Sequence, residues 1–565
     1  MIGKTSIIRA MQKNEISSDS SLSPHRWKAS GRAPRILLCG VFGPYGVDDP
    51  YGRKENNMEL YHNQVTRVQG PASLRFHHRS FGLYFIASNI NADTTILDFP
   101  SRKRFIREIR KDYDIVGISF ITPNFIKARE MARLVRLHAP GSIIVLGGHG
   151  SAIEGVEDLI ECDHVARGEG IRWMRNFLGQ DASAPIAHPI LPCSEYESIF
   201  GVPIPGPTPN VLVPGLGCVN ACNFCCTTHF FEKAYISFLR TGEEVFRECC
   251  RIADARGTQV FSVMDENFLK DCGRARDLLA LMEKHQRWFS FYISSSAEAI
   301  AAFGIDNLIR LGVNMVWIGF ESKSAGEYAK NAGINAAELV RELRDRGVSV
   351  LGSAIMCMEH HTPENIGEDI DFVVGLGTDM MQFMLYTGMP VTGLYEDHKK
   401  RGLIRQNFPY EEWHGQNELN WNHPAFPGDE AKRWLDYAFR RDFEVNSSSI
   451  YRMAETAVRG YKRLAAMESR DACLEARLQQ LAKRVRLYSH LLPLIARRAV
   501  NDMERQRAEA LDAEQIRLLG PLSLGDRLTR MSAKLLAARW DIRLRLFGDR
   551  IQPETIVTHY RARQS

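Results

Sequence analysis

Residues 34–180 alternate between short apolar runs and segments with helical spacing of their apolar positions. A segment such as Asn124–His138 has the period of an amphipathic helix. Four apolar runs have the length of strands: Arg35–Val41, Thr94–Phe99, Ile115–Phe120 and Ile143–Leu146. Strands that alternate with helices predict βαβ units and a mostly parallel sheet covered on both faces. We therefore expect a Rossmann-like α/β domain over 34–180, preceded by a polar leader over 1–33.

A second series of strand-length runs follows a Pro-rich linker at 181–210. Its candidate strands are Val260–Met264, Ser290–Ser294, Met315–Phe320, Val348–Ile355 and Met381–Tyr386. Helical stretches separate these runs, which predicts a second parallel α/β unit over 211–429, either open or closed into a partial barrel. The strand pattern vanishes after residue 430, so we expect a helical C-terminal domain over 430–565 without further strands.

The composition is that of a globular protein. Of the 565 residues, 44% are hydrophobic and 25% are charged, which excludes wholesale disorder. No run approaches the roughly 18 apolar residues that cross a bilayer, so we expect no membrane span. The first residues lack the apolar core of a signal peptide, and 12 cysteines without such a signal indicate reduced thiols. We therefore expect a cytoplasmic protein.

The sharpest motif is a cysteine triplet of the form C-x3-C-x2-C, formed by Cys218, Cys222 and Cys225. Three thiolates so close together on a loop can converge on one iron–sulfur cube. Only three ligands are offered, so the fourth iron would be open to another ligand. Zinc is the alternative metal, but no second Cys/His pair follows at zinc-finger spacing. We expect a [4Fe-4S] cluster on these cysteines, with the side chain of Cys226 pointing away.

This triplet, with Phe224 before its last cysteine, resembles that of the radical S-adenosylmethionine (SAM) superfamily over about 210–400. The resemblance implies a partial (β/α)6 barrel, and SAM bound to the open iron through its amino and carboxylate groups. Electron transfer into the sulfonium would then release a 5′-deoxyadenosyl radical. A low-potential electron donor such as a flavodoxin or ferredoxin is implied as a partner.

Four further motifs resemble the superfamily in strand order, and the last of them is the turn Pro390-Val-Thr392-Gly393-Leu-Tyr395-Glu396. Acidic residues and glycines at strand ends are often only caps and turns, but four in order favour SAM binding. The residues that this resemblance implies for SAM are Phe224, Asp265, Glu266, Asn267, Ser294, Gly319, Glu321 and Ser322. Tyr395 and Cys357, near strand ends, are candidate catalytic side chains.

The segment 34–180 resembles the cobalamin-binding domain that precedes the barrel in one branch of the superfamily. In an open parallel sheet a ligand lies across the C-terminal strand ends, where glycine lets the backbone approach a large flat group. The residues implied for cobalamin are Ser119, Thr122, Gly147, Gly148, His149, Gly150, Gly168, Glu169 and Gly170. No G-x-G-x-x-G is completed, which argues against a dinucleotide. A scaffold without ligand is the alternative.

One departure concerns the lower axial ligand of the cobalt. The Asp-x-His-x-x-Gly signature that supplies a histidine in many corrinoid proteins is missing, so water, Tyr45, Tyr51 or no ligand remain open. A lower face without histidine would favour methyl transfer in a radical step. His360 and His361, beside Glu359, are expected to be ordinary loop residues.

Net charge is unevenly distributed. The chain carries +5, but residues 430–565 hold 27 Lys and Arg against 17 Asp and Glu, so the preceding residues are acidic. Six apolar residues near the end approximate one helical face: Leu524, Leu528, Met531, Leu535, Ile542 and Leu546. A basic amphipathic helix can lie on an anionic membrane, or dock on the barrel with its basic face in solvent, and both stay open. No nucleic-acid module is present.

Together these patterns predict a cobalamin-dependent radical SAM enzyme. We expect a C-methyltransferase that acts on an unactivated carbon of a small-molecule or lipid substrate of hydrophobic character, in the cytoplasm or peripherally at the inner membrane surface. Non-methylating radical chemistry, such as ring formation, oxidation or carbon–carbon coupling, is one alternative. A non-catalytic module that binds cobalamin or carries electrons is an alternative of another class.

Overall fold

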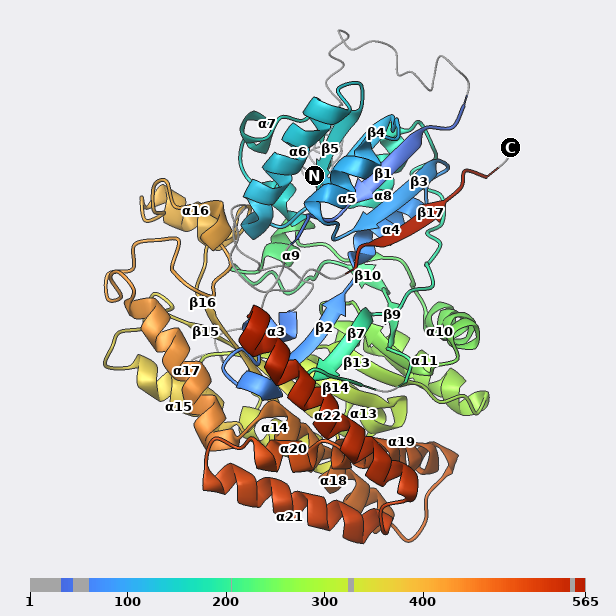
Figure 1. Cartoon of the computed structure of the whole chain (residues 1–565), viewed down its shortest axis with the longest axis vertical. Coiled ribbons are helices and arrows are strands. Elements are labelled where there is room, and N and C mark those ends of the chain that lie inside the picture. Colours follow the sequence, from blue (N-terminus) through green and yellow to red (C-terminus); the bar gives the residue numbers. More distant parts are fainter. Residues whose placement is uncertain (1–31, 44–59, 205, 324–329, 549–553, 564–565) are drawn as a thin grey trace, which may run out of the picture.

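The computed structural model describes residues 32–43, 60–204, 206–323, 330–548 and 554–563. Within them the chain forms two six-stranded sheets, one above the other in Figure 1, and a layer of long C-terminal helices below the second sheet. Nearly all of the predicted leader, and the candidate ligands Tyr45 and Tyr51, lie outside the described residues.

The upper sheet has the order β17-β3-β1-β4-β5-β6. Its strands are β1 (Arg35–Cys39), β3 (Asp93–Asp98), β4 (Ile115–Ser119), β5 (Ile143–Gly147), β6 (His164–Val165) and β17 (Ile556–Tyr560). Five are parallel, and their strand order reverses between β1 and β4, where a doubly wound sheet binds its ligand. Alternate strand residues bury against helices on opposite faces: α4 (Phe81–Ser88) and α8 (Gly170–Phe177) on one, α5 (Arg102–Ile109) and α6 (Phe125–His138) on the other.

The expectation that no strand follows residue 430 was wrong at β17. This strand returns from the far end of the chain and pairs antiparallel with β3, at the edge of the upper sheet. Its sequence, IVTHY, is short, and only pairing with a strand some 460 residues earlier gives it a partner. Pairing at that separation leaves no local signal in the chain.

The lower sheet is entirely parallel, in the order β9-β12-β13-β14-β15-β16. Its strands are β9 (Asn210–Leu212), β12 (Val260–Val263), β13 (Ser290–Ser294), β14 (Val313–Glu321), β15 (Ser349–Met356) and β16 (Met380–Leu385). The helices on its outer face include α10 (Gly242–Arg256), α11 (Cys272–Lys284), α14 (Ala336–Asp345) and α15 (Ile366–Gly375). This is the predicted partial (β/α)6 barrel.

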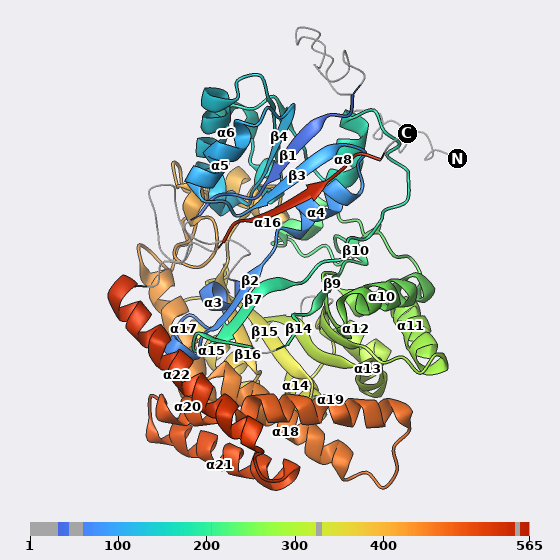
Figure 2. The ribbon, with the colours of Figure 1, turned by 45° about the vertical axis from the view of Figure 1, so that its right-hand side comes forward.

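A small antiparallel sheet lies against the inner face of the barrel. It consists of β2 (Leu74–His78), β7 (Ser194–Ile199) and β8 (Val202–Pro203), the last two from the segment expected as a linker. Leu74 and Ile199 belong to the same hydrophobic cluster as Leu351 of β15 and Met380 of β16. Figure 2 shows β2 and β7 running across the barrel strands.

The C-terminal region is helical, as predicted, apart from β17. Its helices are α17 (Glu430–Asn446), α18 (Ser449–Ala465), α19 (Ala472–Ser489), α20 (Leu492–Arg497), α21 (Asp502–Leu519) and α22 (Leu524–Phe547). Buried Arg477 of α19 donates hydrogen bonds to the carbonyls of Val313 and Gly347, at the starts of β14 and β15. These helices therefore cover the amino ends of the barrel strands and leave the carboxyl ends facing the upper sheet. Among the described residues, no helix is both long and apolar enough to cross a bilayer.

Candidate functional site

The carboxyl ends of the two parallel sheets meet in the middle of the molecule. The turn after β5, η4 (His149–Ala152), contacts helix α9 (Cys226–Phe230), which begins directly after the cysteine triplet. The turn after β4, η3 (Thr122–Asn124), contacts η7 (Tyr410–Glu412), which follows the barrel strands. Lys399 and Glu154 add an ion pair across the same junction. The predicted cofactor sites of the two domains therefore share one boundary.

The three cysteines of the triplet lie on the loop between β10 (Gly215–Leu216) and α9, and all three are partly exposed. Ala221, inside the triplet, has φ +54°, a left-handed turn that reverses the loop. Burial raises the pKa of Cys218 and of Cys222, and the neighbouring Cys225 thiolate raises both further. Three accessible thiols close enough to influence one another form a donor set that fits an iron–sulfur cube with one open iron.

Cys226 differs from its neighbours in the triplet. Burial raises the pKa of its thiol to about 12, which disfavours the thiolate that a metal would need. Cys226 therefore stays outside the predicted set of cluster ligands.

A buried ion pair lies beside the cysteine loop. Glu321, at the end of β14, is buried and pairs with Lys330, whose ammonium lies 5.6 Å from the ring centre of Phe224. A Cβ on Gly319 would fall 2.3 Å from the Glu321 carboxylate, so only glycine leaves room for the pair. Three expected SAM residues thus come together, with Lys330 as a fourth that sequence reasoning missed.

The acidic motif after β12 has two buried side chains, Asp265 and Asn267, and one exposed side chain, Glu266. Asp265 accepts hydrogen bonds from Arg274 at 3.0 Å and from the hydroxyl of Tyr235 at 2.6 Å, in the protein interior. The Asn267 side chain bonds to Ser295 and Ser296 at the start of the next helix. These contacts make Asp265 and Asn267 supporting residues of the loop.

Glu266, by contrast, remains exposed to solvent. The protein atoms packed around the carboxyl of Glu266 remove part of its hydration and so raise its pKa. The charge of Asp265 raises this pKa further. A hydrogen bond from Thr227 of α9 acts in the opposite direction and ties Glu266 to the cysteine loop. Glu266 is therefore the member of the acidic motif that can bind a ligand.

The remaining expected residues of the barrel occupy strand ends or turns. Ser294 is the last residue of β13 and is half-buried, while Ser322 is buried after β14. Tyr395 is half-buried in α16 (Gly393–Lys400), where its backbone N–H donates to Thr392. Cys357 is fully buried, and burial raises the pKa of its thiol far above the ordinary value. Of the two candidate catalytic side chains, Tyr395 alone is accessible.

Ser119 and Gly147 are register partners at the carboxyl ends of β4 and β5, and both are half-buried. Gly148 follows with φ +80°, and a Cβ there would fall 2.6 Å from the carbonyl oxygen of Phe120. A Cβ on Gly150 would overlap the ring of Phe120. These glycines keep the turn tight against β4 and leave a flat edge beside the strand reversal, which fits the cradle expected for a corrinoid.

His149 projects from this turn toward α9, and its ring centre lies 4.5 Å from that of Phe230. Burial lowers its pKa to about 4, so the imidazole is neutral, and its buried Nδ1 atom has no hydrogen-bond partner. An orphaned polar atom at the junction fits a site that a polar ligand completes.

Most of the other residues expected to bind cobalamin are less accessible to a ligand. Thr122 is buried, and the carboxylate of Glu169 caps α8 by accepting from the N–H groups of Ile171 and Arg172. Gly168 has φ +78° with open space around it, whereas Gly170 packs against Ile86.

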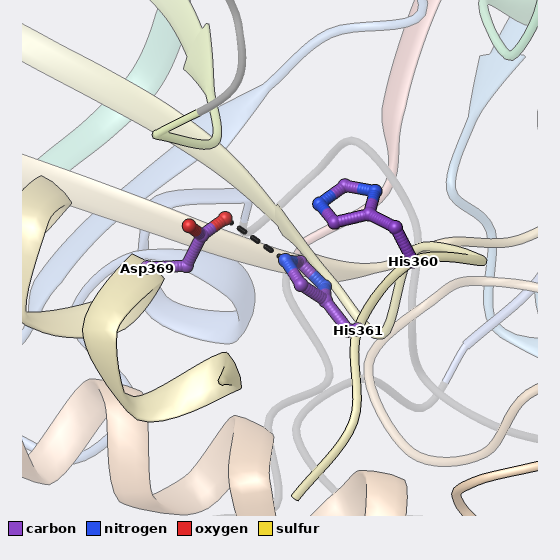
Figure 3. A group of neighbouring side chains, drawn as sticks. All are labelled: His360, His361 and Asp369. Carbon is purple, nitrogen blue, oxygen red and sulfur yellow. Dashed lines mark hydrogen bonds and ion pairs between the residues drawn. The ribbon is translucent and has the colours of Figure 1, made fainter. Parts of the chain in front are cut away.

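Figure 3 shows His360, His361 and Asp369, whose candidate ligand atoms lie within 4.8 Å of one another. His361 Nε2 bonds to Asp369 at 2.8 Å, and its Nδ1 accepts the backbone N–H of Met358 at 2.9 Å. Both nitrogens of His361 are therefore used within the loop, which agrees with the expectation of ordinary loop residues. In a neighbouring group of Glu359, Asp397 and His398, the guanidinium of Arg401 already pairs with both carboxylates.

Comparisons with known proteins agree with this geometry. Residues 72–178 match the B12 binding domain family. The chain is 25% identical over 340 residues to a bacteriochlorophyllide d C-8(2)-methyltransferase of Chlorobaculum tepidum, covering 55% of this chain and 72% of that protein. It is 24% identical over 363 residues to an uncharacterized methyltransferase of Pyrococcus horikoshii, covering 56% and 77%.

The fold also resembles a solved structure. The radical S-adenosylmethionine methyltransferase TsrM from Kitasatospora setae, solved with cobalamin and a [4Fe-4S] cluster bound, superposes with a TM-score of 0.52 at 13% identity. The match covers 80% of this chain and 99% of TsrM. The family match over residues 72–178 confirms the resemblance inferred from the glycine turn, and the superposition on TsrM shows a shared fold.

Proposed function

We infer that the chain is a cobalamin-binding radical SAM enzyme, and we propose that it is a C-methyltransferase acting on an unactivated carbon. The observation that carries the proposal is the contact between η4 and α9, which joins the glycine turn of the upper sheet to the cysteine loop of the barrel. A methyl carrier and a radical generator must both reach one substrate carbon, and this junction brings their expected sites together. The methyltransferase relatives support the same reaction class.

Different residues of the chain would hold the cluster and bind SAM. Cys218, Cys222 and Cys225 hold the cluster, and Glu266 binds the amino group of SAM. Lys330 holds Glu321 in place beside the cysteine loop. When bound, the cluster and SAM supply a carbon radical and cobalamin supplies a methyl carrier.

A hydrophobic substrate is favoured by the inner face of the barrel. Met315 and Trp317 of β14 point away from the outer helices and are only half-buried, whereas Val316 and Ile318, which alternate with them, are fully buried against those helices. Met384 of β16 is likewise half-buried. Half-buried thioether and aromatic side chains on this face, which the sheet of β2, β7 and β8 covers in part, suit an apolar or lipid-like ligand.

The proposal also includes an electron donor, a location in the cell and a side chain that contacts the substrate. Reduction of the cluster calls for a low-potential donor such as a flavodoxin or ferredoxin, and reduced thiols suit a cytoplasmic location, with peripheral contact at the inner membrane surface. Tyr395, accessible in α16, is our candidate for a side chain that contacts the substrate.

Anaerobic purification with cobalamin supplied, followed by metal and corrinoid quantitation, tests the proposal. We expect about four irons and one corrinoid per chain, because one cube and one cofactor are required. Cys218→Ala should lose the iron, while the neighbouring Cys226→Ala should keep it. Equal loss of iron in both variants would contradict the ligand assignment.

Turnover separates the alternatives. Reduced enzyme with SAM should release 5′-deoxyadenosine, and the product should gain the mass of one methylene. Release of 5′-deoxyadenosine without that gain would favour ring formation, oxidation or coupling. A fully loaded protein that releases none would favour the non-catalytic module.

A further inference from the structure

Helix α22 is fixed to the body of the protein along one side only. Ala533 and Ala537 are buried, and Trp540 packs on Gly201 of the β7–β8 hairpin, where a Cβ would overlap the indole. Ion pairs anchor the same side, with Arg530 bound to Asp512 of α21. The orientation of α22 is therefore set by packing.

The opposite side of α22 is apolar and exposed. Its outward residues follow the helical spacing of one continuous face: Leu524, Leu528, Met531, Leu535, Ile542 and Leu546. Leu535 is 67% exposed and Ile542 is 58% exposed. With Leu536 and Phe547, this one helix carries 8 of the 18 large exposed hydrophobic residues found in the described part of the chain. A stripe of this size on a soluble surface marks an interaction site. We call these six residues the outer stripe.

Positive charges border the outer stripe. Arg527, Lys534 and Arg545 lie along one margin and Arg539 along the other, all of them exposed. The acidic residues of the helix, Asp526 and Asp541, instead turn inward, where they pair with His490 and Arg498. The exposed side therefore combines apolar side chains with cations and carries no carboxylate.

We propose that α22 docks the enzyme on an anionic lipid bilayer, lying in the plane of the membrane with the outer stripe among the acyl chains. An apolar face flanked by Lys and Arg is the chemistry that binds such an interface, because the cations meet lipid phosphates as the leucines enter the boundary. A protein partner would instead need a complementary acidic groove. The proposal rests on the surface of α22 and not on the reaction, so either can fail alone.

The position of α22 connects docking with the barrel. Through Trp540 and Gly201 the helix is attached to the sheet of β2, β7 and β8, which lies against the inner face of the barrel (Figure 2). A bilayer on the outer stripe would therefore lie near this side of the barrel. That placement suits the apolar substrate class proposed above.

Vesicle co-sedimentation of the full-length protein tests the proposal. We expect binding to vesicles of phosphatidylcholine with phosphatidylglycerol, little binding to phosphatidylcholine alone, and weaker binding as salt rises. Leu528→Glu with Leu535→Glu should weaken binding at least tenfold. The matched control is Leu137→Glu, at an equally exposed leucine of α6, which should bind as the wild type does.

Charge is tested in the same assay. Arg527→Glu with Lys534→Glu should weaken binding to anionic vesicles, while Lys103→Glu with Lys284→Glu, an equal charge change elsewhere on the surface, should have a much smaller effect. Thermal unfolding verifies that each variant is folded. Equal binding to neutral vesicles, or no effect of the outer-stripe variants, would overturn the proposal. The proposal would also be overturned if the protein does not bind vesicles and instead self-associates in a way that the leucine variants abolish.

Discussion

The ammonium group of Lys330 pairs with the buried carboxylate of Glu321 at the carboxyl end of β14. Burial lowers the pKa of Lys330, but the charges of Glu321 and of the Cys222 thiolate outweigh it and leave the pKa above its ordinary value. Glu321 itself has φ +64°, a conformation that a non-glycine residue adopts only when its surroundings hold it. Lys330 therefore helps to maintain a strained strand end next to the cysteine loop.

Replacing Lys330 by methionine should destabilise the protein by about 3 kcal/mol, because the carboxylate of Glu321 would be buried without a counter-charge. SAM binding, measured by equilibrium dialysis, should weaken as well. The control is Lys323→Met, whose partner Glu368 is exposed, so the loss should stay within about 1 kcal/mol. Glu321→Gln combined with Lys330→Met should recover part of the stability. A Lys330→Met variant as stable as the wild type would refute the stabilising role of the ion pair between Lys330 and Glu321.

Neutralising Asp265 should lower the stability of the protein, whereas neutralising Glu266 should lower its affinity for SAM. Asp265→Asn removes the charge that the buried Arg274 requires, so we expect a loss of about 3 kcal/mol in urea unfolding. Glu266→Gln alters an exposed side chain, so stability should change by less than about 0.5 kcal/mol, whereas SAM affinity should fall about tenfold, the usual effect of losing one charge-assisted hydrogen bond. Unchanged SAM affinity in Glu266→Gln would remove Glu266 from the proposed site.

Most parallel strands of the two sheets were predictable, because each buries apolar side chains in a run bounded by polar turns. Val260–Val263 and Ser290–Ser294, for example, lie almost where the pattern places them. The exceptions are β6 and β9, which are too short to give such a pattern. Pairing over long separations was not predictable. Strand β7 pairs with β2 and strand β17 pairs with β3, each more than a hundred residues away along the chain.

Within the site, the residue types indicated the chemistry of each side chain but not which other residues it contacts. The sequence could not reveal that Asp265 is committed to Arg274 while Glu266 remains open, because adjacent residues differ only in the direction of their side chains. Lys330 lies nine residues after Glu321 and carries no motif, so the sequence gives no sign that the two side chains pair.

Gly148→Ala should disrupt the glycine turn. The new Cβ would lie 2.6 Å from the carbonyl oxygen of Phe120, and the backbone would be held at φ +80°. We expect the variant to lose most of its corrinoid in quantitation after purification. Gly179→Ala is the matched control, since its φ is +72° and no atom lies within 4 Å of the added Cβ. That variant should cost only the backbone strain, about 1 kcal/mol, and retain the corrinoid. Full corrinoid content in Gly148→Ala would contradict the assignment of this edge.

His188 should make stability depend on pH. Its Nε2 accepts the N–H of Val213 at 2.9 Å and its Nδ1 donates to the carbonyl of Pro189 at 2.8 Å, so the buried ring is neutral. Burial lowers its pKa to about 4, against about 6.5 in the unfolded chain. The unfolded state then binds more protons between these values, so stability is present above pH 6.5 and falls as the pH drops toward 4.

The His188→Gln variant isolates this contribution, since the amide oxygen can still accept the N–H of Val213 without titrating. Between pH 7 and pH 5 the wild type should lose about 2 kcal/mol of unfolding free energy more than the variant does. Urea unfolding of the cofactor-free protein measures the difference, because cluster loss in acid then plays no part. His285→Gln, at an exposed histidine after α11, should follow the wild type. Parallel pH profiles for the wild type and His188→Gln would mean that the imidazole gains protons equally in both states, and that the hydrogen bond to Val213 does not hold the ring neutral.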